Sequence, residues 1–315
     1  MANVAILWLI ASASAAVVCV AWFYFRRPAT GTLLRITRYP IKGLAGDRID
    51  VARVMSGGSL AFDRSFALER SAVHLKGDDL AAPDARFDGD APSWRHKSAF
   101  HCAFNARALL APLAPTYSLD KDGALVLSLH DRRSGESLLE RCVLKREGHG
   151  EGNAEVERFF GKWLNDPGLR LVSSRGSGRA FQFNNTTAAE AVLHLVSVST
   201  VAACAARFAM LHGTLSCERF RPNLVVEGLE PWVEFTWVGF IVAIGPDVRC
   251  AVRKRTVRCA ATAHDALSGQ RNCDVPAQLE AHFPEHGPYL GVYLEVLRGG
   301  TLRAGDVVRV TAERA

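Results

Sequence analysis

The chain has 315 residues, of which 49% are hydrophobic and 22% are charged, an ordinary globular composition with the length for one large domain or two smaller ones. A formal net charge of +6 and a pI near 9.0 indicate an acidic partner, an anionic cofactor or an anionic membrane surface. Nucleic acid is not an expected partner, because the basic residues are spread along the chain and no nucleic-acid motif accompanies them.

The N-terminal stretch from Val4 to Phe25 carries no charge, and as a helix it is long enough to cross a hydrocarbon core of about 30 Å. The aromatic run 22–24 lies near its end, and Arg26 and Arg27 follow, as expected at the cytoplasmic side of a membrane. We therefore predict an uncleaved transmembrane signal-anchor. The alternative is a cleaved signal peptide, whose apolar run is usually shorter and follows its basic residues.

The first half of the body is predicted to consist of short strands separated by glycine turns, over 33–39, 47–55, 60–70 and 117–144. This pattern is typical of a barrel or a sandwich. The polar segment 71–100 is predicted to be a long surface loop or lid. A helix with one apolar face is predicted from Asn153 to Trp163, and it ends at a strong turn signal.

The second half alternates predicted strands and short helices. We expect strands over 191–198, 237–244 and 248–252, helices over 201–211 and 276–283, and two strands near the C-terminus. Ser199 and Thr200 are placed to cap the first of these helices. His194 lies among apolar neighbours, where a core histidine is a better interpretation than a metal ligand.

Four cationic residues lie at turns and strand entrances in this pattern. Lys42 follows a predicted strand in YPIKG, and Arg64 lies in FDRSF. Arg219 and Arg221 precede Asn223 in ERFRPN, where Pro222 rules out an ordinary central strand. All four could hold a phosphate or another anion, or they could be ordinary surface charges.

Cys259 is the residue that the chemistry of the chain depends on. It lies in RKRTVRCAATAHDALSG, beside Arg258 and close to three further basic residues. Fixed positive charges favour the thiolate, which binds metals and attacks electrophiles. The eight cysteines include no C-x-x-C pair, which argues against a zinc knuckle and indicates a reducing compartment. Metal ligation by Cys259 and a nucleophilic, sulfur-carrying thiol both remain open on these residues.

The order of several motifs resembles the MOSC superfamily, and most closely the mitochondrial amidoxime reducing component (mARC). These motifs are YPIKG, FDRSF, FRPNLVVEG, VRCAAT-x-x-D-x-x-SG and a terminal G-x-L-x-x-GD-x-V. The resemblance implies an α+β, mainly β fold in three parts. The expected parts are an N-terminal transmembrane helix and linker (1–30), a MOSC N-terminal β-barrel (31–170) and a MOSC β-barrel domain with a few helices (171–315).

The resemblance also implies a molybdenum cofactor, a molybdopterin whose dithiolene holds the metal. Cys259 matches the family's cysteine, which supplies the single protein ligand and is the expected catalytic residue. The positions that match the family's cofactor-binding residues are Lys42, Arg64, Arg221 and Asn223. Arg258 is added because it adjoins the metal ligand, and Thr200 because it lies near a family serine.

By this resemblance the protein is expected to reduce small N-hydroxylated compounds such as amidoximes. Electrons are expected from a cytochrome b5-type protein and its NADH-dependent reductase. The expected location is a membrane surface facing the cytosol, on the mitochondrial outer membrane or the endoplasmic reticulum. Two alternatives remain: a MOSC protein that carries the cofactor without catalysis, and a sulfur-carrier thiol protein without metal.

Overall fold

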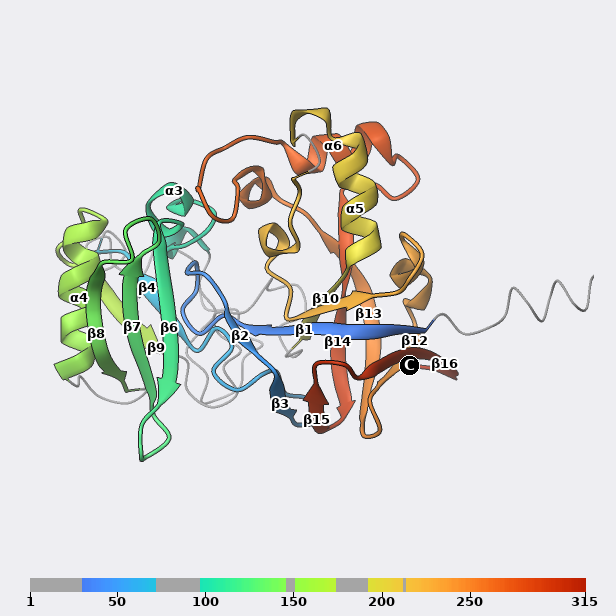
Figure 1. The fold of residues 1–315 in the computed structure, drawn as a ribbon, viewed down its shortest axis with the longest axis horizontal. Coiled ribbons are helices and arrows are strands. Elements are labelled where there is room, and N and C mark those ends of the chain that lie inside the picture. The colour runs from blue at the N-terminus through green and yellow to red at the C-terminus, as the bar shows by residue number, and fades with distance from the viewer. Residues whose placement is uncertain (1–29, 72–96, 146–150, 174–191, 212–213) are drawn as a thin grey trace, which may run out of the picture.

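A computed structural model of the chain describes residues 30–71, 97–145, 151–173, 192–211 and 214–315. The main feature of the fold is an eight-stranded sheet that closes into a barrel, because β1 pairs with both β11 and β16. The eighth strand, β2, pairs with β1 alone and lies outside the closed ring. Figure 1 shows this barrel at one end of the molecule and a smaller sheet with α4 at the other. The strands of the large sheet are β1 (Thr30–Arg38), β2 (Asp47–Ile49), β10 (Val192–Ser197), β11 (Leu224–Glu227), β12 (Phe240–Ile244), β13 (Val248–Val257), β14 (Tyr289–Arg298) and β16 (Val307–Arg314).

The barrel is mostly antiparallel, with one parallel pair. β10 and β11 run parallel, and α5 (Val198–Arg207) lies in the connection between them, as a parallel pair requires. Apolar side chains such as Leu33, Val242 and Leu294 fill the barrel interior without exposure to solvent. A second helix, α6 (Val275–His282), lies beside α5 over one end of the barrel (Figure 1) and shares a small apolar core with it.

The first half of the body forms two small open sheets. β4 (Phe66–Glu69) lies between β5 (Phe100–His101) and β9 (Arg170–Ser173), and a meander joins β6 (Leu113–Leu119), β7 (Leu125–Asp131) and β8 (Ser137–Leu144). The helices here are α3 (Arg107–Leu110) and α4 (Glu151–Trp163), whose apolar face, including Val156 and Phe160, belongs to a core separate from that of the barrel.

The remaining elements are short. β3 (Val51–Val54) pairs with β15 (Gly300–Arg303). The single-turn 3-10 helices are η1 (Lys97–Ala99), η4 (Ala209–Leu211), η5 (Cys217–Phe220), η6 (Val233–Trp237) and η7 (Ala260–Ala263).

The predicted fold class is wrong. The described part of the chain is mainly β with one closed barrel, and two open three-stranded sheets lie where an N-terminal barrel was expected. Its first strand, β1, belongs instead to the barrel built by the second half. No helix in the described part of the chain is long and apolar enough to cross a membrane.

The predicted location is corrected by the same finding. The predicted anchoring by a membrane-spanning helix finds no support among the residues that the structure describes. The proposed anchor at 4–25, and most of the predicted lid at 71–100, lie outside those residues.

Glu234 is a buried carboxyl group with few hydrogen bonds to offset the loss of solvent. It lies in η6 with no exposure to solvent. The hydroxyl of Thr200 donates to its Oε2 atom at 3.0 Å, and Oε1 has no hydrogen-bond partner among the described residues. Burial raises the pKa of Glu234 to about 7, although hydrogen bonds act in the opposite direction.

This burial predicts a fall in stability with rising pH. Well below the unfolded pKa, near 4.5, Glu234 is protonated in both the folded and the unfolded state. Between that value and the folded pKa of about 7, the folded state keeps the proton while the unfolded state releases it, so the free energy of unfolding falls as the pH rises. Between pH 5 and 8 the wild type is expected to lose about 3 kcal/mol of unfolding free energy relative to Glu234→Gln. Urea unfolding across this range measures the difference, with the exposed Glu230→Gln as control. Parallel pH profiles for wild type and Glu234→Gln would contradict the prediction.

Candidate cofactor site

A cavity of about 920 Å³ lies between the barrel and the segments of the first half that carry residues 42–43, 64 and 102–104. Its charge is one-sided, since no acidic side chain lines it among the described residues. The cationic side chains that line it are Lys42, Arg64, Arg221, Lys254, Arg255 and Arg258. Such a cavity favours an anionic ligand.

Tyr39 forms the platform for two of these cations. The guanidinium carbons of Arg64 and Arg221 lie 4.8 and 4.3 Å from the centroid of its ring. Its hydroxyl donates to the carbonyl of Pro222 at 3.1 Å, and burial raises its pKa to about 12, so the ring stays neutral. Asp63 connects the group, accepting from Tyr39 N at 2.7 Å and from Arg64 Nη1 at 2.5 Å.

Arg64 and Arg221 are both held in the left-handed backbone conformation, with φ of 51° and 54°. A side chain with a Cβ rarely adopts this conformation, and such strain collects at functional sites. Arg64 Nη2 donates to the carbonyl of Arg221 at 3.4 Å, and Arg221 Nη1 donates to Leu44 O at 2.6 Å. Burial, together with the charges of Arg107 and Arg64, lowers the pKa of Arg221 to about 9. Arg221 is still a cation at neutral pH, in a place where a bound anion would stabilise it.

Arg258 is fixed at the end of β13 by backbone carbonyls. Its Nη1 and Nη2 atoms donate to Leu290 O at 3.2 Å and Phe220 O at 3.1 Å. Nη1 also lies 3.2 Å from His194 Nε2. Burial and the charge of Arg258 hold the pKa of His194 well below its usual value, so the ring is neutral and accepts at Nε2. The Nε atom of Arg258 has no hydrogen-bond partner among the described residues.

Cys259 presents its thiol at the point where β13 ends and η7 begins. Its carbonyl accepts from Thr262 N at 2.9 Å and from Thr262 Oγ1 at 2.8 Å, which fixes the backbone and leaves the side chain at the cavity. Among the seven described cysteines, Cys259 is exposed and the others are buried or half-buried. No cluster of three or more His, Cys, Asp or Glu suited to a metal occurs in the described part of the chain. A metal bound at Cys259 would therefore bring most of its own ligands.

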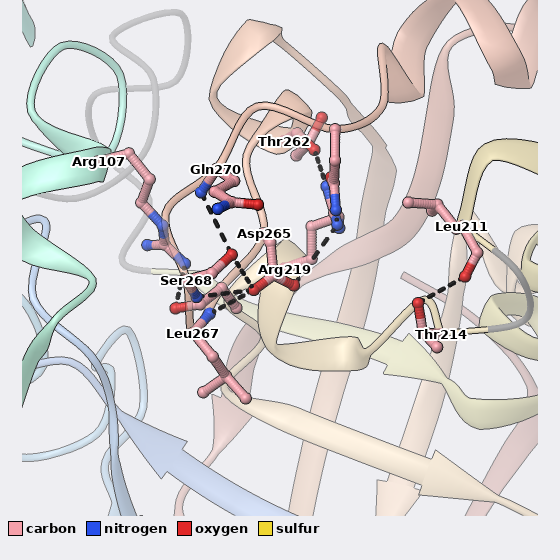
Figure 2. Close-up of polar contacts among 11 residues, drawn as sticks. Arg107, Leu211, Thr214, Arg219, Thr262, Asp265, Leu267, Ser268 and Gln270 are labelled. Carbon is pink, nitrogen blue, oxygen red and sulfur yellow. Dashed lines mark hydrogen bonds and ion pairs between the residues drawn. The ribbon is translucent and has the colours of Figure 1, made fainter. Parts of the chain in front are cut away.

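The loop after Cys259 is held from one side by Arg219 (Figure 2). This buried side chain donates through Nη1 to Thr262 O at 3.1 Å and through Nη2 to Asn272 Oδ1 at 2.9 Å. Asp265 lies 3.6 Å from Nη2. Because Thr262 also holds the carbonyl of Cys259, Arg219 positions the thiol through one intermediate residue.

The first half of the chain holds the same loop from the other side. Arg107, at the start of α3, donates through Nη2 to Ala266 O at 3.2 Å, and Figure 2 shows it reaching the loop from the side opposite to Arg219. Gly269 packs against α3 with φ of 70°, and a Cβ there would lie 2.8 Å from the Cα of Ala108. The position of the Cys259 loop therefore depends on both halves.

The structure brings five of the predicted site residues to one cavity and places two elsewhere. The five are Lys42, Arg64, Arg221, Arg258 and Cys259. Asn223 is buried in the barrel wall, where its Nδ2 atom donates to Thr37 O at 3.1 Å and its Oδ1 atom accepts from His194 N at 3.2 Å. Thr200 joins α5 to η6, since its hydroxyl also accepts from Trp232 N at 2.8 Å.

Sequence reasoning missed Tyr39, Lys254 and Arg255. Tyr39 stood in the YPIKG motif but carried no charge to single it out. Lys254 and Arg255 stood in the basic cluster around Cys259, yet successive residues of a regular strand point to opposite faces. The irregular register of β13 that brings both to the cavity is not visible in the sequence.

A family model for the MOSC domain matches residues 180–309, so this part of the chain carries a MOSC domain. MOSC domains are generally associated with binding of the molybdenum cofactor. The matched range includes Arg221, Arg258 and Cys259, whereas Lys42 and Arg64 reach the cavity from outside it. The comparison with curated proteins gives no match.

Several solved structures are similar at a low level. YuaD from Bacillus subtilis is 10% identical, with a TM-score of 0.36 over 90% of this chain and 97% of that one. YiiM from Geobacillus stearothermophilus is 18% identical, with a TM-score of 0.28 over 38% of this chain and 53% of that one. YiiM from Escherichia coli is 15% identical, with a TM-score of 0.30 over 39% of this chain and 55% of that one. Likenesses at this level carry no argument about function.

The residues of the cavity fit a molybdenum pterin cofactor. The group is anionic, and the cavity is lined by cations without an acidic side chain among the described residues. The sequence resemblance implies one protein thiolate on the metal, and Cys259 is an exposed cysteine with no surrounding cluster of metal ligands among the described residues. The Nε atom of Arg258, buried without a partner among the described residues, is a donor that such an anion would satisfy.

The Arg219 contacts predict a specific loss when they are removed. Arg219→Met keeps the length of the side chain but leaves Thr262 O and Asn272 without their donor, and it is expected to cost about 2–3 kcal/mol of unfolding free energy. Amide exchange over 260–273 is expected to rise. Urea unfolding and hydrogen exchange measure both effects.

The matched control is Arg271→Gln, which changes a cation in the same loop whose side chain is 64% exposed. It is expected to stay within about 0.5 kcal/mol of wild type. If Arg219→Met behaved like this control, the loop would be held by other contacts.

Proposed function

We propose that the protein is a molybdenum-cofactor oxidoreductase that reduces N-hydroxylated compounds of the amidoxime type. The observation that carries the proposal is the convergence of one exposed cysteine and six cations on one cavity, four of which lie within the MOSC match. The family match supports the cofactor, and the resemblance of the sequence motifs to mARC supports the reaction.

The residues have distinct roles in this proposal. Cys259 would supply the thiolate ligand of the metal, and Arg258 beside it would hold the anionic cofactor at its buried Nε. Arg64 and Arg221, stacked on Tyr39, would hold the negatively charged end of the pterin together with Lys42. Arg64 and Arg221 are held by contacts within the protein before binding, which lowers the entropic cost of holding the cofactor.

When bound, the cofactor would supply two electrons and remove the oxygen of an N-hydroxyl group as water, with two protons consumed. The protein's contribution is position and access. Cys259 directly follows Arg258, whose side chain is held by backbone carbonyls, and the carbonyl of Cys259 is held by Thr262.

We also propose a cytochrome b5-type protein, reduced by an NADH-dependent reductase, as the electron donor. Such proteins are usually acidic, and the basic character of this chain, with a pI near 9.0, would speed their encounter. The rate of electron delivery is then expected to fall as ionic strength rises.

The experiment compares the full chain with Cys259→Ala after expression in a host that makes the cofactor. Molybdenum is measured by mass spectrometry, pterin by fluorescence of its oxidised form, and benzamidoxime reduction with the cytochrome and its reductase. Wild type is expected to contain molybdenum and to form benzamidine, and Cys259→Ala is expected to lose both the metal and the activity. Cys217→Ala, which removes a half-buried thiol outside the cavity, is the matched control.

The outcomes separate the three functions. Metal-loaded protein that forms no benzamidine would be a cofactor carrier, and the reductase proposal would fail. Protein without metal or pterin that gains a persulfide at Cys259 would be a sulfur carrier. Loss of metal in Cys217→Ala as large as in Cys259→Ala would remove the special role of Cys259.

A further inference from the structure

Two cations of the cavity, Lys254 and Arg255, come from consecutive positions of β13. A regular strand would point them to opposite faces of the sheet. The pairing of β13 with β14 shifts register on both sides of the pair, between Val252 and Lys254 and between Arg255 and Val257. Such irregularities re-aim side chains, and both Lys254 and Arg255 line the cavity.

Arg255 stacks on an aromatic ring, and no hydrogen-bond acceptor for its side chain is found among the described residues. Its guanidinium carbon lies 4.5 Å from the centroid of the Phe235 ring. No hydrogen bond or ion pair joins this guanidinium to another of the described residues. By contrast, Arg253 on the same strand donates through Nε to Glu295 Oε2 at 2.6 Å. The N–H donors of the half-buried Arg255 are therefore available to a ligand in the cavity.

The cavity wall near Arg255 is aromatic. Phe235, Tyr289 and Tyr293 line it together with Arg255, and the ammonium of Lys254 lies 6.0 Å from the centroid of the Tyr293 ring. Aromatic side chains favour flat partners, and a guanidinium both stacks on rings and holds a carboxylate through paired N–H groups. A neutral aliphatic ligand would cover these donors without satisfying them, which costs binding energy.

We infer that the substrate is a flat aromatic molecule that carries an anionic group, and that Arg255 anchors this group. Arg255 and Cys259 are four residues apart, so their Cα atoms are at most about 14 Å apart and one small molecule reaches from one to the other. The inference rests on the proposed function for the reducible N-hydroxyl group. The anchoring of the anionic group stands on the contacts of Arg255.

The test measures binding of three small probes to the full chain by isothermal titration calorimetry: benzoate, its neutral analogue benzamide, and cyclohexanecarboxylate. Wild type is expected to bind benzoate about tenfold more tightly than either of the others. Arg255→Gln is expected to lose about tenfold in affinity for benzoate and less than about twofold for benzamide. Arg253→Gln, which removes an equal charge outside the cavity, is expected to bind all three like wild type.

Three results would overturn the inference. One is equal affinity of wild type for benzoate and benzamide. Another is a loss of benzoate affinity in Arg253→Gln as large as in Arg255→Gln, which would show a general effect of charge. The third is a complete loss of benzoate binding in Lys42→Gln while Arg255→Gln binds benzoate like wild type. This result would place the carboxylate of benzoate among the cations assigned to the cofactor.

A kinetic comparison separates this inference from the proposed function. The ratio kcat/KM is measured for 4-carboxybenzamidoxime and benzamidoxime in wild type and in Arg255→Gln. If neither compound is reduced but benzoate binds as expected, the proposed reductase function is rejected, and the binding of an anionic group by Arg255 is kept. If wild type reduces both compounds equally well, the reductase function is supported, and the inference of an anionic substrate is rejected.

Discussion

The site depends on how several positive charges are held together around one cavity, where some of them, such as Arg64, are buried. A desolvated cation is stabilised by hydrogen bonds, by aromatic faces or by an anion. Tyr39 provides an aromatic face for Arg64 and Arg221. Asp63 accepts a hydrogen bond from Arg64, and backbone carbonyls accept from Arg221 and Arg258. The protein still supplies fewer negative charges than positive ones at this cavity, which makes an anionic ligand the natural completion of the fold. Left-handed backbone at Arg64 and Arg221 is the local cost of this arrangement.

The same constraint explains why the two halves of the chain cannot act separately. Lys42 and Arg64 reach the cavity from the first half, whereas Arg221, Arg258 and Cys259 belong to the barrel. β1 closes that barrel although it lies far from the other strands in sequence. The Cys259 loop is likewise held by Arg219 on one side and by α3 on the other. A change in the packing of the halves would therefore move the thiol relative to the cations that surround it.

The chemistry of the site was more predictable than its architecture. Lys42, Arg64 and Arg221 are cations at turns and strand entrances, and such positions are readable from proline, glycine and strand patterns. The closure of the barrel by β1 was not predictable, because long-range strand pairing leaves no mark in local periodicity. The sequence also could not separate Thr200 from a ligand-binding hydroxyl, since its bonds to Glu234 and Trp232 arise only in the folded chain. Asn223 poses the same problem, because a buried amide that joins strands and one that binds a ligand look alike in sequence.

The central claim is that Cys259 is the single protein ligand of a metal that the cationic cavity holds through its anionic cofactor. X-ray absorption at the molybdenum edge tests this directly, because it counts the sulfur neighbours of the metal. The full chain purified with its cofactor is predicted to show the dithiolene pair and one further sulfur, and Cys259→Ser is predicted to lose that further sulfur in any metal it retains. An unchanged sulfur count in Cys259→Ser, at full metal occupancy, would contradict the account.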